Sequence, residues 1–279
     1  MKKKTQELSR RQMLAAMAIS SLGGVAKGSV FNPAKTPSDF FHPIKSRTVT
    51  INAKPEPIAI DVSKTAVIVV DMQNDFGSKG GMFDLAGIDI SIIQKVVGPT
   101  AKALSAARKS GVRIIYLKMG FHPDLSDLGA LDSVSRIRGG KKMGFGKVVQ
   151  APDGTEGRIL VRDTWNTDIV PALKPHTGDI AIYKTRYSGF YRTELDSLLK
   201  KLQCRHLIIT GCTTSICVDS TIRDAMFRDY QPILLADCTA EPVGYGLSRS
   251  NHEATLLTVQ VNFGWVSSSG EFIKALGDT

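Results

Sequence analysis

The chain has 279 residues, 42% of them hydrophobic, which is enough to bury a sizeable core. Its net charge of +10 suggests a nucleic-acid partner, but six of the 36 basic residues and one of the 26 acidic residues lie within residues 1–28, and the rest of the chain has a net charge of +5. Because the remaining basic residues are scattered, without aromatic side chains interleaved among them, nucleic-acid binding is not expected.

Residues 1–28 have the features of an export signal. The sequence SRRQML at 9–14 resembles the twin-arginine motif, with a lysine run before it and a modestly apolar segment at 13–26. This segment is too short and too rich in Ala, Ser and Gly to remain as a membrane anchor. We therefore expect cleavage near residues 26–28 and a periplasmic or secreted mature protein. The alternative is a chance pair of arginines before an amphipathic helix.

Residues 29–60 contain five prolines and little periodicity, which indicates an extended lead-in to the domain that follows. Beyond them, apolar runs typical of buried strands alternate with helical patterns. The expected strands are 65–70, 112–117, 179–183, 206–210, 233–236 and a short 263–267, and the expected helices are 91–109, 194–202, one from about Cys217, and 248–261. This alternation predicts an α/β fold of three layers, a single domain at 61–279 with a mostly parallel, Rossmann-like sheet between helices.

Two segments between these elements are expected to be loops. Residues 77–87 contain several glycines, and residues 118–169 form a long insertion with clustered glycines and lysines at 138–147. The insertion is not a phosphate-binding loop, because Lys141 replaces a required glycine and Val148 replaces the Ser or Thr that would bind magnesium. A loop of this length in a compact domain is usually a lid or a subunit contact.

The stretch from Cys204 to Ala236 carries the strongest signal for chemistry. Two apolar runs enclose a short loop and a helical pattern, so the stretch is one strand–helix–strand unit whose loop, at 211–216, leads to Cys217 at the start of the helix. Unpaired N–H groups and the helix dipole favour an anion there, so we expect an acidic thiol and a cysteine nucleophile. The alternative is that Cys217 is one more small buried apolar residue.

Asp71 and Lys184 also follow predicted strands, so with Cys217 they share the carboxyl edge of the sheet, where open α/β folds place their sites. A carboxylate at the end of a buried strand needs partners or a task. Asp71 can accept the thiol proton and return it to a leaving amine, while Lys184 stabilises the charged pair. Backbone N–H groups of the loop before Cys217 can form an oxyanion hole. The alternative for Asp71 is a helix-capping or turn residue.

Three blocks of sequence carry a resemblance to a known family: TAVIVVDMQNDF at 65–76, YKTRYSGFYRTELDSLL at 183–199 and TGCTTSICVDSTIRDAMFRDY at 210–230. They resemble the isochorismatase-like cysteine hydrolases, and the likeness covers nearly the whole chain after residue 60. Within that family, GGMFDLAGIDIS, RYSGF with TELDSLL, and FGWVSSSGEF are most similar to the ureidoacrylate amidohydrolases. Next come the biuret hydrolases, through HPDLSDL and RILVRDTWNTDIVPAL.

The resemblance implies a specific catalytic machinery. Asp71, Lys184 and Cys217 match the positions of the family's catalytic triad. A cis peptide bond is implied between Cys212 and Thr213, so that the backbone N–H groups of Thr213 and Cys217 face the oxyanion. Homo-oligomerisation is also common in the family, and we expect it here.

One departure from the family concerns metal binding. Nicotinamidases, which belong to this family, bind a metal through an Asp-x-His pair after the second strand. Here Gly120 stands two residues before His122, so the Asp is missing and His122 is expected to be a loop residue. We therefore expect no catalytic metal and no other cofactor.

The expected function is that of an amidohydrolase that cleaves a C–N bond in a small linear amide or ureido compound through an acyl-enzyme on Cys217. Each aromatic candidate for substrate binding could instead belong to the core or to a lid. A second possibility is hydrolysis of an isochorismate-type vinyl ether, which in this family can proceed without the cysteine. The third is a non-catalytic binding protein on the same fold, although retention of all three triad residues argues against it. The candidate substrate-binding residues are Gln73, Phe76, Phe121, Trp165, Tyr187 and Gln260.

Overall fold

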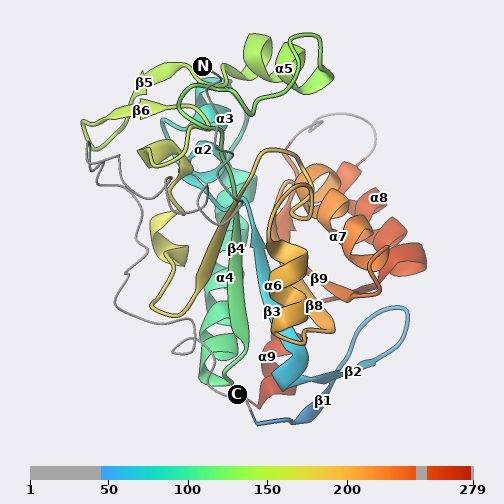
Figure 1. Cartoon of the computed structure of the whole chain (residues 1–279). Helices are drawn as coiled ribbons and strands as arrows, with labels where there is room; N and C mark the ends of the chain where they lie inside the picture. Colours follow the sequence, from blue (N-terminus) through green and yellow to red (C-terminus); the bar gives the residue numbers. More distant parts are fainter. Residues whose placement is uncertain (1–44, 243–249, 278–279) are drawn as a thin grey trace, which may run out of the picture. The chain divides into compact units, whose positions relative to one another are not determined.

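A computed structural model of the chain describes residues 45–242 and 250–277, so the expected export signal at 1–28 lies outside the described residues. Within them, six strands form one parallel sheet in the order β10-β9-β8-β3-β4-β7 (Figure 1). The predicted α/β fold with a parallel central sheet is confirmed. The strands are β3 Thr65–Val70, β4 Arg113–Met119, β7 Ile180–Lys184, β8 His206–Cys212, β9 Gln231–Ala240 and β10 Trp265–Ser267.

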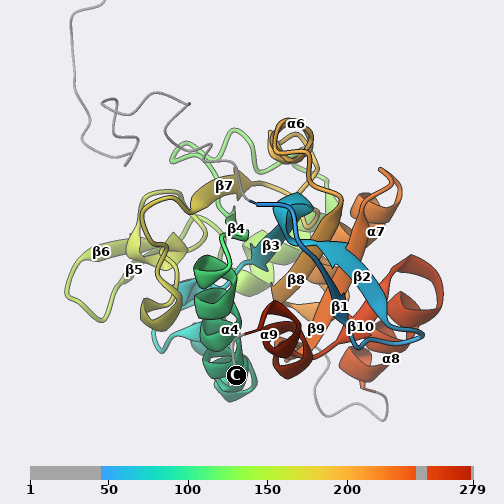
Figure 2. The ribbon, with the colours of Figure 1, turned by 90° about the horizontal axis from the view of Figure 1, so that it is seen from below.

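Helices cover both faces of this sheet. Helices α4 (Ser91–Lys109) and α9 (Ser269–Leu276) lie on one face, and α6 (Leu195–Lys201) and α7 (Asp219–Met226) lie on the other (Figure 2). Helix α8 (Asn251–Thr258) packs against the same apolar cluster as α6 and α7. Three layers follow from this arrangement, because each helix buries one apolar stripe against the sheet.

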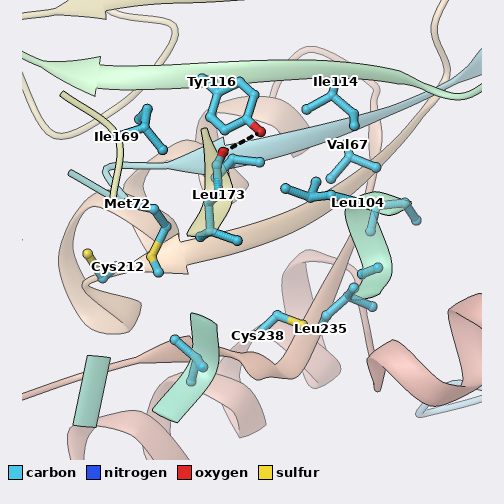
Figure 3. Packing of buried hydrophobic residues seen from close by; sticks show 14 of the residues in the cluster. Val67, Met72, Leu104, Ile114, Tyr116, Ile169, Leu173, Cys212, Leu235 and Cys238 are labelled. Atoms are coloured by element: carbon cyan, nitrogen blue, oxygen red, sulfur yellow. Dashed lines mark hydrogen bonds between the residues drawn. The ribbon is translucent and has the colours of Figure 1, made fainter. Parts of the chain in front are cut away.

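Strand β3 is central to both layers of the core. All six of its residues are buried, and they alternate between the two faces as the strand period requires. Val67 and Val69 face the side of α4 and α9, whereas Ala66, Ile68 and Val70 face the side of α6 and α7. Figure 3 shows part of the first cluster, in which the Tyr116 hydroxyl donates to Leu173 O at 2.8 Å. Each fully buried Val or Ile stabilises the fold by roughly 1.5–3 kcal/mol.

The second half of the expected lead-in is folded. Strands β1 (Thr48–Ile51) and β2 (Ile58–Asp61) form a two-stranded antiparallel sheet, and a short 3-10 turn at Val62–Lys64 leads into β3. Lys54, between the two strands, forms an isolated bridge with Val266 of β10. This segment therefore packs on the domain.

The expected loops contain short elements. Helices α2 (Asn74–Gly77) and α3 (Met82–Leu85) lie in and beside the glycine-containing segment, and the insertion contains α5 (Val134–Arg138), a π-helical turn at Gly139–Met143, and the hairpin of β5 (Val148–Gln150) and β6 (Glu156–Arg158). Two 3-10 turns follow, at Trp165–Thr167 and Pro171–Leu173. Figure 1 shows α5, β5 and β6 at the end of the molecule where the sheet strands finish. The insertion thus lies over the carboxyl edge of the sheet.

Several boundaries differ from the predicted ones, and β4 and β8 each continue two residues beyond their predicted ends. Strand β9 continues to Ala240, beyond the predicted end at Ala236, because Thr239 and Ala240 still pair with Gly211 and Cys212 of β8. The expected last helix is α8 followed by a π-helical turn at Val259–Phe263, and part of its predicted start lies outside the described residues. In the described part of the chain, every helix is too short or too polar to cross a bilayer.

Candidate active site

Asp71 is the first residue after β3, at the carboxyl edge of the sheet. Its φ of 52° lies in the left-handed region, which aspartate adopts more readily than most residues, and its N–H donates to Leu117 O at 2.9 Å. The carboxylate accepts one hydrogen bond on each oxygen: from the N–H of Met119 on Oδ1 at 3.0 Å, and from Nζ of Lys184 on Oδ2 at 2.7 Å. Asp71 is completely buried, so these donors replace the water that it has lost.

Lys184 is the last residue of β7, which is separated from β3 by β4 alone. Its side chain is fully buried, and Nζ donates to Asp71 and to the carbonyl oxygen of Arg186 at 3.3 Å. Burial on its own lowers the pKa of Lys184, but the neighbouring Asp71 and Cys217 outweigh burial and raise that pKa. The side chain therefore stays an ammonium ion.

Cys217 lies in a π-helical turn, Thr214–Val218, that joins β8 to α7. Its thiol is buried beside Asp71 and Lys184, close enough for both charges to change its pKa. Strand β8 pairs with β3 on the side opposite to β4, so the three strand ends meet at one edge. The structure thus brings together the three side chains that the sequence placed at that edge, although they come from distant parts of the chain.

The thiol of Cys217 is not acidic in this site, so that expectation is wrong. Burial raises the pKa of the Cys217 thiol, Lys184 opposes this in part, and Asp71 raises the pKa further. The expectation assumed an accessible helix N-terminus, whereas the sulfur is buried and the nearby ammonium already has a carboxylate partner. Burial also raises the pKa of Asp71 against the opposing effect of Lys184, which makes the carboxylate a better acceptor for the thiol proton.

The loop between β8 and Cys217 has the geometry that the family resemblance implied. The peptide bond between Cys212 and Thr213 is cis. Thr213 is buried, and its carbonyl oxygen accepts from the N–H groups of Ile216 at 3.1 Å and Val218 at 3.2 Å. These bonds fold the chain back, so that Thr213 and Cys217 stand at the two ends of one tight turn.

Gln73 uses its side chain within the protein. Its Nε2 donates to the carbonyl oxygens of Met119 at 2.9 Å and Thr167 at 3.3 Å, and its Oε1 accepts from the N–H of Met119 at 2.7 Å. The side chain is completely buried. Since both N–H bonds of the amide are satisfied, Gln73 joins the end of β4 to the insertion and has no donor left for a substrate.

The four aromatic candidates separate by exposure. Phe76 and Phe121 are buried: Phe76 contacts Phe83 edge-on with ring centroids 5.1 Å apart, and Phe121 contacts Phe145 at 5.6 Å. Trp165 is half-buried. Tyr187 has an exposed fraction of 47%. Trp165 and Tyr187 are therefore the aromatic candidates that a substrate can reach.

The placement of Gln260 at the site needs correction. It lies in the turn that immediately precedes β10 and lines a hollow of about 380 Å³ with Arg205, Gln231 and Trp265. Those three residues stand at the amino ends of β8, β9 and β10, so the hollow is at the edge of the sheet opposite to Cys217. Gln260 is too far from the cluster to contact a substrate there.

His122 is held in the insertion. Its N–H donates to Asp127 at 2.9 Å, and Nε2 lies 3.2 Å from the guanidinium of Arg162. Among residues 45–242 and 250–277, no group of three or more His, Cys, Asp or Glu side chains is arranged to hold a metal ion. All four cysteines are buried free thiols.

Sequence reasoning missed several residues that support the cluster. Met119, the last residue of β4, donates its N–H to both Asp71 and Gln73, but the strand predicted from the sequence ended two residues earlier, at Leu117. Thr214 and Ser215 anchor the turn that carries Cys217 to residues at the end of β9. No signal for those anchors existed while β9 was predicted to end at Ala236.

Comparison with known proteins agrees with this geometry. The Isochorismatase domain family matches residues 65–271. The ureidoacrylate amidohydrolase RutB of Methylorubrum extorquens is 41% identical over 228 residues, which cover 82% of this chain and 89% of that protein. The RutB of Serratia proteamaculans is 39% identical over 229 residues, with the same coverage of 82% and 89%.

Solved structures of cysteine hydrolases and amidases are also similar to this chain. A cysteine hydrolase from Pseudomonas syringae pv. phaseolicola has a TM-score of 0.64 and 30% identity, covering 78% of this chain and 94% of that chain. N-carbamoylsarcosine amidase from Thermoplasma acidophilum has a TM-score of 0.53 and 26% identity, covering 74% and 96%. The chain belongs to the isochorismatase family.

Proposed function

We propose that this chain is an amidohydrolase that cleaves the C–N bond of a small linear amide or ureido compound, with Cys217 as the nucleophile. One observation carries the proposal: the Cys217 thiol contacts a completely buried ion pair, Asp71 with Lys184, whose charged atoms are 2.7 Å apart. The relatives named ureidoacrylate amidohydrolase and N-carbamoylsarcosine amidase support the class of bond and make a ureidoacrylate-like compound the preferred substrate.

The reaction follows from the arrangement of these groups. When a substrate carbonyl reaches the site, the sulfur of Cys217 forms a bond to the carbonyl carbon and the thiol proton passes to Asp71. The N–H groups of Thr213 and Cys217 donate to the resulting oxyanion. As the C–N bond breaks, Asp71 returns the proton to the leaving nitrogen, which leaves a thioester on Cys217.

Water completes the cycle. Asp71 takes a proton from water as the oxygen attacks the thioester, and the C–S bond then breaks to release the acid and restore the thiol. Lys184 keeps its charge throughout, so it stabilises the Asp71 carboxylate and the departing thiolate. A neutral thiol at rest is compatible with this scheme, because proton transfer to Asp71 accompanies attack.

A panel assay tests the proposal. Ammonia release is measured with ureidoacrylate, biuret, nicotinamide and N-carbamoyl amino acids, and turnover of a linear ureido or amide compound is expected. Cys217→Ala should abolish turnover and keep the fold, whereas Cys204→Ala, a change at another buried cysteine before β8, should keep turnover. Full activity of Cys217→Ala would exclude the thiolate mechanism and favour the vinyl ether reaction of the family.

We also propose that residues 1–28 direct export through the twin-arginine pathway to the periplasm or beyond. The support is the SRRQML sequence with its preceding lysines and following apolar segment. Cell fractionation should find the wild type in the periplasm and the Arg10→Lys/Arg11→Lys variant in the cytosol. Lys27→Arg, which keeps the motif intact, is the matched control. Cytosolic, uncleaved wild type would contradict export.

A third proposal concerns assembly: the chain forms a homo-oligomer. The support is the family resemblance together with three large apolar side chains exposed on the insertion, those of Leu131, Val134 and Ile137. Sedimentation equilibrium should give a mass that is a multiple of the chain mass. A single 30.2 kDa species for the full chain at micromolar concentration would contradict it.

A further inference from the structure

A chain of three hydrogen bonds runs from α8 to the end of β8. Nδ1 of His252 lies 3.0 Å from Oγ1 of Thr214, and this hydroxyl oxygen lies 3.0 Å from Oγ1 of Thr239. The Thr239 hydroxyl in turn donates to the carbonyl oxygen of Gly211 at 2.8 Å. Both threonines are buried, whereas His252 is half-buried.

The positions of the hydrogens in this chain follow from counting donors. The Gly211 carbonyl can only accept, so the one hydrogen of the Thr239 hydroxyl is used there, and Thr239 must accept from Thr214. The one hydrogen of the Thr214 hydroxyl is then used as well. All three contacts are hydrogen bonds only if Nδ1 of His252 carries a hydrogen and donates it to Thr214.

Thr214 is the point at which this chain meets the catalytic cluster. It directly follows Thr213 and opens the π-helical turn that contains Cys217. Gly211 and Thr239 are paired in the sheet, which happens only because β9 extends beyond Ala236. The bonded chain therefore fixes the first residue of the turn to two strands and to a helix that packs against the turn.

A second anchor holds the next residue of the turn. The N–H of Ser215 donates to Oε2 of Glu241 at 2.8 Å, and the Ser215 hydroxyl donates to the same oxygen. Glu241 follows the last residue of β9. Residues of β9 and the residue after it thus bind both Thr214 and Ser215. His252, on α8, adds a hydrogen bond to Thr214 from outside the sheet.

We propose that His252 is a positioning residue: its Nδ1–H fixes Thr214, and through Thr214 it holds the N–H groups of Thr213 and Cys217 where the oxyanion forms. This inference rests on the proposed function, because it assigns His252 a part in that same reaction. His252 does not contact the triad in this scheme and acts only through the turn. Its loss should therefore lower kcat more than it changes KM, because the oxyanion forms only after attack and is absent from the bound substrate.

Two substitutions separate the Nδ1 donor from the rest of the ring. The amide nitrogen of Asn occupies a position like that of Nδ1, whereas the amide nitrogen of Gln occupies a position like that of Nε2. With the substrate found in the panel assay, His252→Gln should lower kcat roughly 10- to 100-fold at little change in KM, the scale expected for a displaced catalytic group. His252→Asn should restore most of kcat, and His176→Asn, at an exposed histidine, is the matched control. Equal losses for Asn and Gln, or no loss for either, would overturn the proposal.

A measurement without turnover keeps the inference testable on its own. ¹⁵N NMR of the neutral His252 ring should show the proton on Nδ1, and Thr214→Val should shift that resonance whereas Thr214→Ser should change it little. A neutral ring with its proton on Nε2 would overturn the proposal even if the substituted enzymes fail to fold. Failure of the proposed function has a different signature: no compound is turned over, or Cys217→Ala stays active, while the His252 tautomer is unaffected.

Discussion

The carboxylate of Asp71 and the ammonium of Lys184 are 2.7 Å apart, and both side chains have an exposed fraction of 0%. Taking two ions out of water costs several kcal/mol for each, which their attraction offsets only when further hydrogen bonds satisfy the remaining atoms. Met119 and Arg186 supply such bonds here. An apolar pair would fill the same space without this cost, so the ion pair is explained better by its contact with Cys217 than by stability.

Breaking this pair from either side should destabilise the fold strongly. Asp71→Asn or Lys184→Met leaves one buried charge without its partner, so each should lower the free energy of unfolding by about 3–5 kcal/mol. The double variant should lose less than the sum, because neither charge remains. Urea denaturation measures the free energy of unfolding of the two single variants and of the double variant. Lys200→Met is the matched control, since it removes an exposed pair with Asp196 at the same 2.7 Å and should change stability by at most about 0.5 kcal/mol. Additive losses in the double variant would contradict the coupling.

Cys217 should alkylate slowly at neutral pH and faster as the pH rises. Burial raises the pKa of its thiol above the ordinary cysteine value, so the reactive thiolate is a smaller fraction than in free cysteine. Below that pKa the thiolate fraction grows about tenfold for each pH unit. The rate of iodoacetamide addition, assigned to Cys217 by peptide mass mapping, gives the pH profile. Lys184→Met should slow the reaction further, because Lys184 lowers this pKa. A rate already independent of pH near neutrality would show an acidic thiol instead.

Gly211 should tolerate no side chain. Its φ of +117° is unfavourable for L residues, and a Cβ there would lie 2.0 Å from the carbonyl oxygen of Val70, next to Asp71. Gly211→Ala should therefore lower the free energy of unfolding by at least about 1–3 kcal/mol and reduce turnover, because β3 and β8 must move apart at the site. Gly87→Ala is the control: its φ is +73°, but a Cβ would meet nothing within 4 Å. Similar losses in both variants would mean that the backbone angle, and not the contact, decides the cost.

Sequence reasoning placed Asp71, Lys184 and Cys217 together because the ends of buried strands can be read from the sequence. The run TAVIVV ends at Asp71, and parallel strands place their ends at one edge, so Lys184 and Cys217 could be assigned to the same place without any coordinates. The rule that parallel strands share their two edges could also have placed Gln260. Its position just before a predicted strand already indicates the amino edge, opposite to the cluster.

Other features depend on contacts that a pattern of residue types does not contain. The amide of Gln73 is satisfied by Met119 and Thr167, which are distant in sequence, so its role could not be read from its place beside Asp71. The raised pKa of Cys217 depends on how deeply the turn is buried. The length of β9 was underestimated because aspartate is uncommon in strands, and Asp237 follows the predicted end of this strand. In the structure the carboxylate of Asp237 accepts a hydrogen bond from the N–H of Ser269 at 2.8 Å, and β9 continues through it.

Asp75 should make the stability of the fold depend on pH. Burial raises the pKa of its carboxyl from 3.8 to about 6, although Asn166 and the N–H groups of Leu160 and Met82 donate to it and oppose the shift. Between about pH 4 and pH 6 the folded protein keeps a proton that the unfolded chain releases, so the free energy of unfolding should fall as the pH rises through this window and level off above it. The size of the effect is about 2–3 kcal/mol.

The pH dependence is measured by urea denaturation at a series of pH values, for the wild type and for Asp75→Asn. Asn cannot titrate, so the difference between the two proteins isolates Asp75 from every other group. Asn also presents an NH₂ group to three donors, so the variant should be less stable than the wild type at all pH values. The margin should be smaller above pH 6, because only the wild type loses stability as the pH rises from about 4 to about 6. A margin that grows with pH would mean that the hydrogen bonds outweigh burial and that the carboxylate, and not the acid, is the stable form in the folded protein.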